Sequence, residues 1–462
     1  MNALDAAAIA AAVNARTLAA EEVTEAFLAR IGALNPAINA LVRFDAEAAR
    51  HQARAVAARI ANGERPALAG VPVVVKDNIW IAGWRSAQGS RLFADHVAPA
   101  DAIGIARLKG AGAVIVGIGN CSEFAAKGVT ANPLFGPTRH PMNHALTPGG
   151  SSGGNAAALA AGFAPIALGT DAGGSSRRPP AHTGTVGFKP SLGAIAYGPG
   201  FAEPFWGVSV LAPMGRTVRD VATLFAALQG PDPRDPESAA VEAPAPWAPA
   251  NLRLAFSPKL GLDVPVDAEV SAAIEAGVDR LAKAGFPIRR ADPMWPPDAA
   301  EAGLMPLQHA GLAAIHGAAW KADPARFDPD LAAQIERGLG LAGVEVAAAL
   351  ETSLLVRRAF AGFFADYDLL IAPTSPTVAW PLTALGPTHI GGVPVPPRGH
   401  AVFTPLINHA LAPAISIPCG RGRDGLPVGV QIIGRRGTDH LVLAAAAIAE
   451  DLLADLNDYP RL

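Results

Sequence analysis

A lysine and two serines lie in segments whose surroundings could activate them. Lys76 closes the apolar run "VPVVVK", Ser151 lies in "GGSSGG", and Ser175 follows two glycines in "GTDAGGSSR". A lysine at the end of a buried strand is poorly solvated, which favours the neutral amine that can act as a base. A serine needs such a base to become a nucleophile. Glycines before Ser175 would let main-chain N–H groups converge on a substrate oxygen, so these segments predict acyl transfer to a serine.

The stretch "TPGGSSGGNAAALAAG" (147–162) has three other interpretations, and its context disfavours each of them. A flexible linker would be longer and would not run directly into an apolar helix. A phosphate-binding loop would need a lysine and a hydroxyl where Asn155 and Ala156 stand. A nucleophile elbow, G-x-S-x-G, requires a strand immediately before it, and the preceding "TRHPMNHALTP" is polar and proline-rich. Ser151 is therefore not expected to be the nucleophile of an elbow.

Composition narrows the class of protein. The chain has 462 residues, of which 50% are hydrophobic and 17% charged, with a net charge of −3. No basic run is present, so we expect no nucleic-acid partner. The two cysteines, Cys121 and Cys419, lie far apart, which argues against a disulfide framework or a cysteine zinc site. The start "MNALDAAAIAAAV" has no basic segment, and the longest apolar stretch is interrupted by Pro165, so we expect a cytoplasmic protein without a membrane segment.

The histidines do not form a metal motif. His140 and His144 are four residues apart, but Pro141 lies between them and would disrupt a helical pair of ligands. Glu123 is a carboxylate near the predicted site, and a structural hydrogen bond is the simpler role for it. We therefore expect no metal and no organic cofactor.

Helical and strand patterns alternate along the chain, which predicts an α/β protein with helices covering a largely parallel sheet. Residues 5–61 read as three helices with a break at Asn35–Pro36, and a buried strand then ends at Lys76. Later strands are predicted in "AVIVGIGN", "APIALGTDAGG", "LRLAFS", "YDLLIAP" and "LPVGVQIIG", with helices dominating 266–365 and a last helix after residue 438. The proline-rich stretch 230–251 is either a domain boundary or a surface loop.

Several motifs in order resemble the amidase signature family of serine hydrolases. They are "GVPVVVKDN", "GNCSEFA", "PGGSSGGNAAALAAG", "LGTDAGGSSRRPPAHTGTVGFKPSLG", "APMGRTVRDVA", "YDLLIAPTSPT" and "GLPVGVQIIG". The resemblance implies an α/β fold with one large mixed sheet covered on both faces by helices. It also implies a single domain over residues 1–462, with 230–251 as a loop.

The resemblance assigns roles to particular residues. It implies that Ser175 is the nucleophile, that Ser151 is a bridging serine on a cis peptide, and that Lys76 is the base. The oxyanion hole and its support would consist of the main-chain N–H groups of Ala172, Gly173, Gly174 and Ser175, braced by Asp171 and Arg177.

The chain departs from the family pattern beside the expected pocket. Lys127 stands where relatives often have glycine, and Ala125, Lys127 and Gly128 are predicted to line the pocket. His140, Ser176 and Thr183 replace a frequent asparagine, isoleucine and cysteine.

The expected substrate is a small apolar or aryl amide, because the segments predicted to line the pocket are rich in Ala, Pro, Leu and Trp. A carbamate, a urea or an ester would suit the same triad. The glutamine-hydrolysing subunit of a tRNA-dependent amidotransferase is disfavoured, because Ala401 stands where such relatives carry an acidic residue. A catalytically silent binding protein is disfavoured by the intact triad. We expect the protein to be a monomer or a homodimer.

Overall fold

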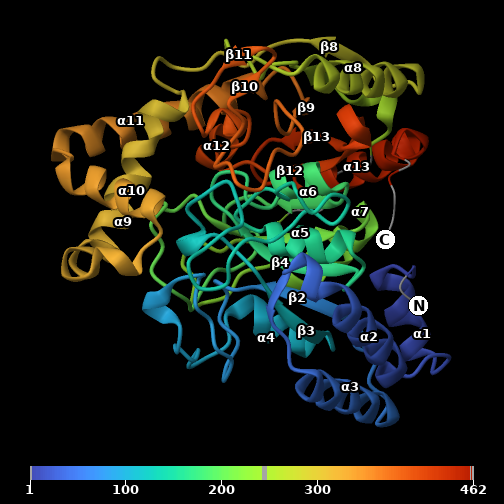
Figure 1. Cartoon of the computed structure of the whole chain (residues 1–462). Coiled ribbons are helices and arrows are strands. Elements are labelled where there is room, and N and C mark those ends of the chain that lie inside the picture. The colour runs from blue at the N-terminus through green and yellow to red at the C-terminus, as the bar shows by residue number, and fades with distance from the viewer. Residues whose placement is uncertain (1–2, 242–246, 458, 460–462) are drawn as a thin grey trace.

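A large mixed sheet forms the centre of the molecule, and helices pack around it (Figure 1). The computed structural model describes residues 3–241, 247–457 and 459. The main-sheet strands are β1 (Leu41–Arg43), β2 (Pro72–Lys76), β3 (Val114–Gly119), β4 (Ile166–Asp171), β5 (Val186–Lys189), β6 (Val210–Gly215), β7 (Leu254–Phe256), β8 (Ile288–Arg290), β9 (Leu369–Pro373), β12 (Ala414–Arg421) and β13 (Pro427–Gly434). A separate hairpin pairs β10 (His389–Ile390) with β11 (Val393–Pro394).

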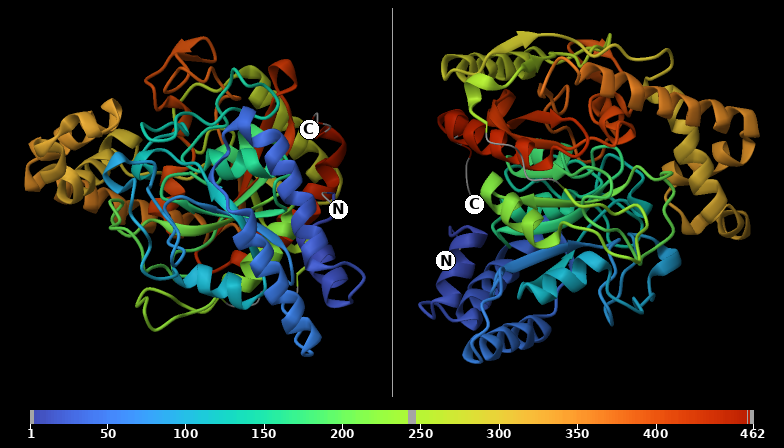
Figure 2. Two further views of the ribbon diagram at one scale, coloured as in Figure 1. Left: turned by 60° about the horizontal axis from the view of Figure 1, so that its bottom comes forward. Right: turned by 180° about the vertical axis from the view of Figure 1, so that it is seen from behind.

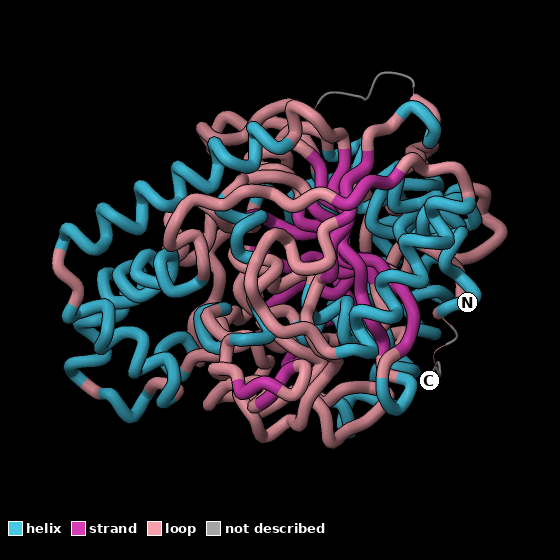
Figure 3. The backbone as a smooth tube through the Cα atoms, turned by 90° about the horizontal axis from the view of Figure 1, so that it is seen from above, coloured by secondary structure: helices cyan, strands magenta, loops and turns pink. Residues whose placement is uncertain are grey.

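Helices account for most of the remaining regular structure. They are α1 (Ala6–Asn14), α2 (Ala20–Ile38), α3 (Ala46–Ala61), α4 (Ile103–Gly110), α5 (Gly153–Ala160), α6 (Arg178–Thr183), α7 (Val218–Leu228), α8 (Ala268–Lys283), α9 (Glu301–Ala322), α10 (Pro329–Gly340), α11 (Gly343–Phe363), α12 (Pro405–His409) and α13 (Asp439–Leu453). Seen from above, the strands run through the middle of the molecule with helices on either side (Figure 3). The mixed, helix-covered sheet implied by the family resemblance is confirmed.

The main sheet has the order β1-β3-β2-β4-β6-β5-β12-β13-β9-β7-β8. Among its described strands, β2–β3, β2–β4, β7–β8 and β7–β9 pair in parallel, and the other six neighbouring pairs are antiparallel. The largely parallel sheet predicted from the alternation of elements is therefore wrong. One reason is connection length: the few residues between β12 and β13 allow a hairpin, whereas parallel neighbours need a long crossover.

The three predicted N-terminal helices are present, but the break lies later than predicted. Helix α2 continues through Pro36 to Ile38 and ends at Asn39, whose φ of 55° is left-handed. Proline removes only the hydrogen bond from its own nitrogen, and here it lies within the last turn, where the helix is about to end. Chain reversal therefore occurs at Asn39 rather than at Asn35–Pro36.

The proline-rich stretch 230–251 contains no strand or α-helix in its described part, only a 3₁₀ turn at Pro249–Asn251. The strands before it, β1 to β6, lie together in the sheet, and those after it form the other side. The two groups meet where β5 pairs with β12, with Phe188 opposite Ile415.

Helices α9, α10 and α11 extend away from the sheet as an arm, coloured yellow to orange in Figures 1 and 2. No single helix in the described ranges is long and apolar enough to cross a bilayer. The pair α10 and α11, bent by 107° where they meet, would meet that requirement only when counted together, by length and composition.

Candidate active site

Lys76 ends strand β2 and is completely buried. Its Nζ lies 2.8 Å from Ser151 Oγ and 2.9 Å from Thr170 Oγ1. Thr170 lies one residue before the end of β4, which runs parallel to β2, so the ends of both strands meet at the same edge of the sheet. Burial lowers the pKa of Lys76 from 10.5 to about 8. The structure therefore places a lysine that is readily neutral against a serine hydroxyl.

Ser151 lies in a tight turn that precedes helix α5. The peptide bond between Gly150 and Ser151 is cis. A side chain at Gly150 would have its Cβ 2.7 Å from the Val129 main chain, so only glycine fits there. Thr130 fixes the far side of the turn, because its Oγ1 accepts a hydrogen bond from Gly153 N at 2.8 Å. No strand precedes Ser151 directly, which agrees with the rejection of a nucleophile elbow.

Ser175 lies in the turn that connects β4 to α6. The carboxylate of Asp171 accepts hydrogen bonds from Gly174 N at 2.6 Å and from Ser176 N at 3.1 Å, which closes the turn around Ser175. Gly174 has a φ of 110°, and a Cβ there would overlap the side chain of Thr404. Both the conformation and the space therefore require glycine.

The two serine turns are joined by their main chains. Ser152 N donates to Ser175 O at 3.3 Å, so the residue after Ser151 contacts the residue predicted to be the nucleophile. Ser175 itself is buried, with 6% of its surface exposed. The structure thus brings the lysine, the Ser151 turn and the Ser175 turn to one place.

Asp171 and Arg177 form an ion pair in which both side chains are fully buried. Burial alone would raise the pKa of Asp171, but the Arg177 guanidinium and the hydrogen bonds of Asn408 hold it well below its usual range. Arg177 also donates to Asn408 Oδ1 and to Gln431 Oε1, which come from the far end of the chain. This brace holds the glycine turn from behind.

The four main-chain N–H groups predicted to form the oxyanion hole are not equivalent in the structure. The N–H of Gly174 is already engaged by Asp171. The N–H groups of Ala172, Gly173 and Ser175 have no acceptor among the residues that the structure describes. These three groups are available to bind a substrate oxygen.

Sequence reasoning missed several residues of the site. Thr170 stands directly before Asp171 at the strand end, and its hydroxyl also accepts from Asn78 Nδ2 at 2.9 Å. The order Lys-Asp-Asn after an apolar strand was a usable signal for Asn78, since strand ends collect polar site residues. Asn408 and Gln431 carried no such signal, because only the folded chain brings them to Arg177.

A cavity of about 50 Å³ adjoins the Ser175 turn at Ala172 and Gly173. Its wall is mainly apolar, and Arg398 is its only charged side chain in the described part of the chain. The full lining is Ala172, Gly173, Phe205, Val208, Leu304, Met305, Leu307, Gln308, Arg398, Pro405 and His409. Several of these residues come from helix α9, so the arm forms one wall.

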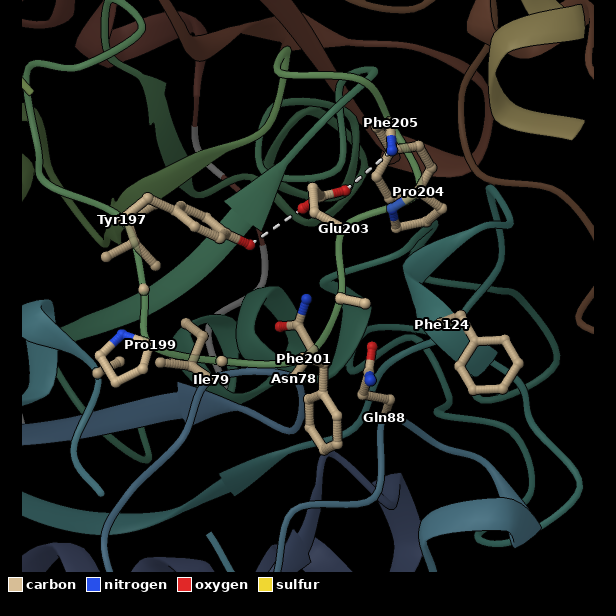
Figure 4. A pocket seen from close by; sticks show the side chains of 15 residues that line it. Asn78, Ile79, Gln88, Phe124, Tyr197, Pro199, Phe201, Glu203, Pro204 and Phe205 are labelled. Atoms are coloured by element: carbon tan, nitrogen blue, oxygen red, sulfur yellow. Dashed lines mark hydrogen bonds between the residues drawn. The ribbon is translucent and has the colours of Figure 1, made fainter. Parts of the chain in front are cut away.

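A second, smaller cavity has Asn78 among the residues that line it (Figure 4). Its volume is about 30 Å³, enough for one water molecule. Glu203 on its wall accepts hydrogen bonds from Tyr197 Oη and Phe205 N, both at 3.2 Å. Phe205 borders both cavities.

The three predicted pocket residues line neither cavity. Lys127 is buried, and its Nζ lies 2.5 Å from Asp328 Oδ2. Gly128 packs against the ring of His400. Their assignment to the substrate pocket stays a prediction, as does that of Ala125.

The ionisable side chains outside the triad do not gather into a metal centre. Within residues 3–241, 247–457 and 459, no three His, Cys, Asp or Glu side chains are grouped so that they could hold a metal ion. Glu123 accepts a hydrogen bond from Asp328 N at 2.7 Å, consistent with the structural role expected for it.

At this edge of the sheet a lysine base lies beside serine hydroxyls. Known proteins that resemble this chain in sequence and structure belong to one family. The sequence model of the Amidase family matches residues 22–443. An acylamidase from Rhodococcus erythropolis is 35% identical, over 96% of this chain and 94% of its own. A glutamyl-tRNA(Gln) amidotransferase component from Roseiflexus is also 35% identical, over 91% of each chain. The crystal structure of a bacterial aryl acylamidase superposes with a TM-score of 0.90 at 29% identity and covers 99% of both chains.

The chain therefore belongs to the amidase signature family and is a hydrolase that acts on amide bonds.

Proposed function

We propose that the protein hydrolyses amides that carry a small apolar or aryl acyl group. The observation that carries the proposal is the mainly apolar cavity beside Ala172 and Gly173, directly next to the turn of Ser175. An acyl group seated there would hold its carbonyl carbon near the serine. The similarity to an acylamidase and an aryl acylamidase supports this substrate class.

In the proposed mechanism Ser175 Oγ attacks the amide carbon. Its proton passes to Ser151 Oγ as the proton of Ser151 passes to neutral Lys76 Nζ. The unengaged N–H groups of Ala172, Gly173 and Ser175 hold the carbonyl oxygen as it becomes negative. The proton then returns along the same path to the leaving nitrogen, the C–N bond breaks, and the amine departs. Water attacks the acyl-enzyme in the same way and releases the carboxylic acid.

The glutamine-hydrolysing role of the amidotransferase relatives fits this site less well. Ala401 is buried and carries no charge where an ammonium group would need an acidic partner. The charged side chain on the cavity wall, Arg398, is cationic, so among the described residues this wall offers an ammonium group no carboxylate partner. Carbamates, ureas and esters remain compatible with the chemistry and form separate arms of the test.

The test compares purified wild-type protein with Ser175→Ala on a matched panel of anilides, primary amides, carbamates, ureas and esters. We expect the highest kcat/KM for apolar or aryl amides and no turnover by Ser175→Ala, because the atom that forms the acyl-enzyme is gone. Ser152→Ala is the matched control and should stay active. Preference for glutamine or for an ester over every apolar amide would overturn the substrate assignment, and fluorophosphonate labelling of Ser175→Ala at the wild-type rate would overturn the nucleophile.

A further inference from the structure

Helices α9 and α10 are tied to the loop 122–130, which also contacts the Ser151 turn. At one end, Leu304, Met305 and Leu307 of α9 form a wall of the cavity beside Gly173. The rest of the arm lies outside the sheet (Figures 1 and 2). The position of α9 therefore sets the dimensions of the cavity.

The strongest tie is the ion pair between Lys127 and Asp328. The Nζ–Oδ2 distance is 2.5 Å, and only 7% and 12% of the two side chains are exposed. Asp330 lies 3.6 Å from the same Nζ. Removing one member of such a pair leaves an uncompensated charge in a buried position, which is strongly unfavourable. The pair therefore favours one placement of the arm.

Three weaker contacts act at the same junction. The ring of Phe124 stacks on His316 of α9 with centroids 3.9 Å apart. Gln308 Nε2 of α9 donates to Ala126 O at 3.2 Å. Asp328 N, at the start of α10, donates to Glu123. The loop itself has left-handed φ angles at Phe124 and at the next residue, a conformation that needs support from its neighbours.

The same loop reaches the catalytic turn one residue beyond Lys127. A Cβ at Gly150 would lie 2.8 Å from the Gly128 main chain, so this segment packs directly against the cis turn that carries Ser151. A shift of the arm at Asp328 would thus move the cavity wall, whereas the packing of Gly128 against the Ser151 turn holds that end of the loop in place.

We propose that Lys127 and Asp328 are positioning residues that determine which acyl groups the enzyme accepts, by fixing the α9–α10 arm against the loop 122–130. The inference rests on the proposed function, because it assigns the α9 cavity to the acyl group. It also accounts for a lysine where related sequences often have glycine: in this chain that side chain holds the arm.

The test uses the full chain with Lys127→Met, Asp328→Asn and the double variant. Asparagine keeps an oxygen at the start of α10, where Asp328 accepts from Asp330 N, so the substitution isolates the charge. We expect each single variant to raise KM for the preferred short-chain anilide at least fivefold with kcat within threefold. The ratio of kcat/KM for a six-carbon acyl group to that for a two-carbon acyl group should change at least fivefold in each single variant. In the double variant, the change in this ratio should be smaller than the sum of the changes in the two single variants. Lys109→Met, which breaks the ion pair between Lys109 on α4 and Asp101 before that helix, is the matched control.

A second measurement does not depend on any substrate. Hydrogen exchange of the α9 and α10 amides should be at least fivefold faster in Lys127→Met than in wild type, while the rate of fluorophosphonate labelling stays within threefold. Unchanged exchange in the arm, or an unchanged acyl-length ratio, would overturn the role of the pair. If the wild type is labelled but cleaves none of the amides, the proposed function fails, and the exchange experiment still decides whether the pair holds the arm.

Discussion

The contacts of Lys76 leave the lone pair of its neutral amine directed at the hydroxyl of Ser151. A neutral amine has two N–H bonds, and Thr170 offers two acceptors, Oγ1 at 2.9 Å and O at 3.4 Å. With both N–H groups directed at Thr170, the lone pair remains for the Ser151 hydroxyl 2.8 Å away. Thr170 thus orients the base, and burial lowers the pKa of Lys76 to about 8, so that a usable fraction of the amine is neutral near physiological pH.

The rate should rise with pH as Lys76 loses its proton. Its pKa falls from 10.5 to about 8 on burial, so the active neutral form dominates above pH 8 and declines about tenfold per pH unit well below it. We expect kcat/KM for a good amide to follow a single ionisation near pH 8, measured between pH 5.5 and 10. Lys76→Ala should lower kcat by ~10²–10⁴-fold and lose this acidic limb. A flat wild-type profile with chemistry as the slow step would contradict a lysine base.

The two neighbouring serines should differ sharply. Ser151→Ala interrupts the relay but leaves the nucleophile, so we expect kcat to fall by ~10²–10⁴-fold with slow acylation still occurring at Ser175. Within the described residues the Ser152 hydroxyl makes one hydrogen bond, to Thr170 O at 3.4 Å, so Ser152→Ala should keep most of the activity. Peptide mapping of enzyme trapped with a covalent inhibitor locates the adduct. An adduct on the peptide containing Ser151, with none on Ser175, would reverse the assignment.

At the scale of elements, the β4–α6 turn depends on a brace supplied by other parts of the chain. Arg177 reaches Thr404 O and Asn408 around helix α12 and Gln431 on β13. The turn therefore keeps its shape only when these elements are packed behind it.

Asp171→Asn should destabilise the protein by about 3–5 kcal/mol, because it leaves the Arg177 charge buried without its partner. Chemical denaturation measures the loss, and the rate of fluorophosphonate labelling should fall with it as the turn loosens. Asp368→Asn is the control: its partner Arg253 is 54% exposed, and such surface pairs contribute about 0–1 kcal/mol. Equal losses in the two variants would show that the brace contributes no more than a surface ion pair.

The sequence predicted those elements whose signals are local. The sequence correctly predicted the apolar strand that ends in Lys76 and the glycine turn after "IALGTD". Both features depend on residues that are adjacent in the sequence. Strand direction was misread, since the alternation of helices and strands does not specify which strands become neighbours. The partner of Lys127 could not be found, because 201 residues separate it from Asp328 and only packing of the arm brings them together.

At the scale of the whole molecule, strands that precede the proline-rich stretch and strands that follow it belong to one continuous sheet. The β5–β12 pairing joins strands from both sides of residues 230–251, so we propose that the stretch is a loop within a single domain. Calorimetric unfolding should then show one cooperative transition with equal calorimetric and van't Hoff enthalpies. Two separable transitions, one of them retained by a fragment ending before residue 242, would place a domain boundary there.

The brace also has a consequence for the timing of synthesis. Lys76, Ser151 and Ser175 are all synthesised long before Gln431, which follows them in the chain. Until β13 has left the ribosome and inserted between β12 and β9, Arg177 lacks this partner and the nucleophile turn lacks its backing. A nascent chain that lacks β13 should therefore be unable to cleave amides, and hydrolytic activity should begin only after residues 427–434 have been made.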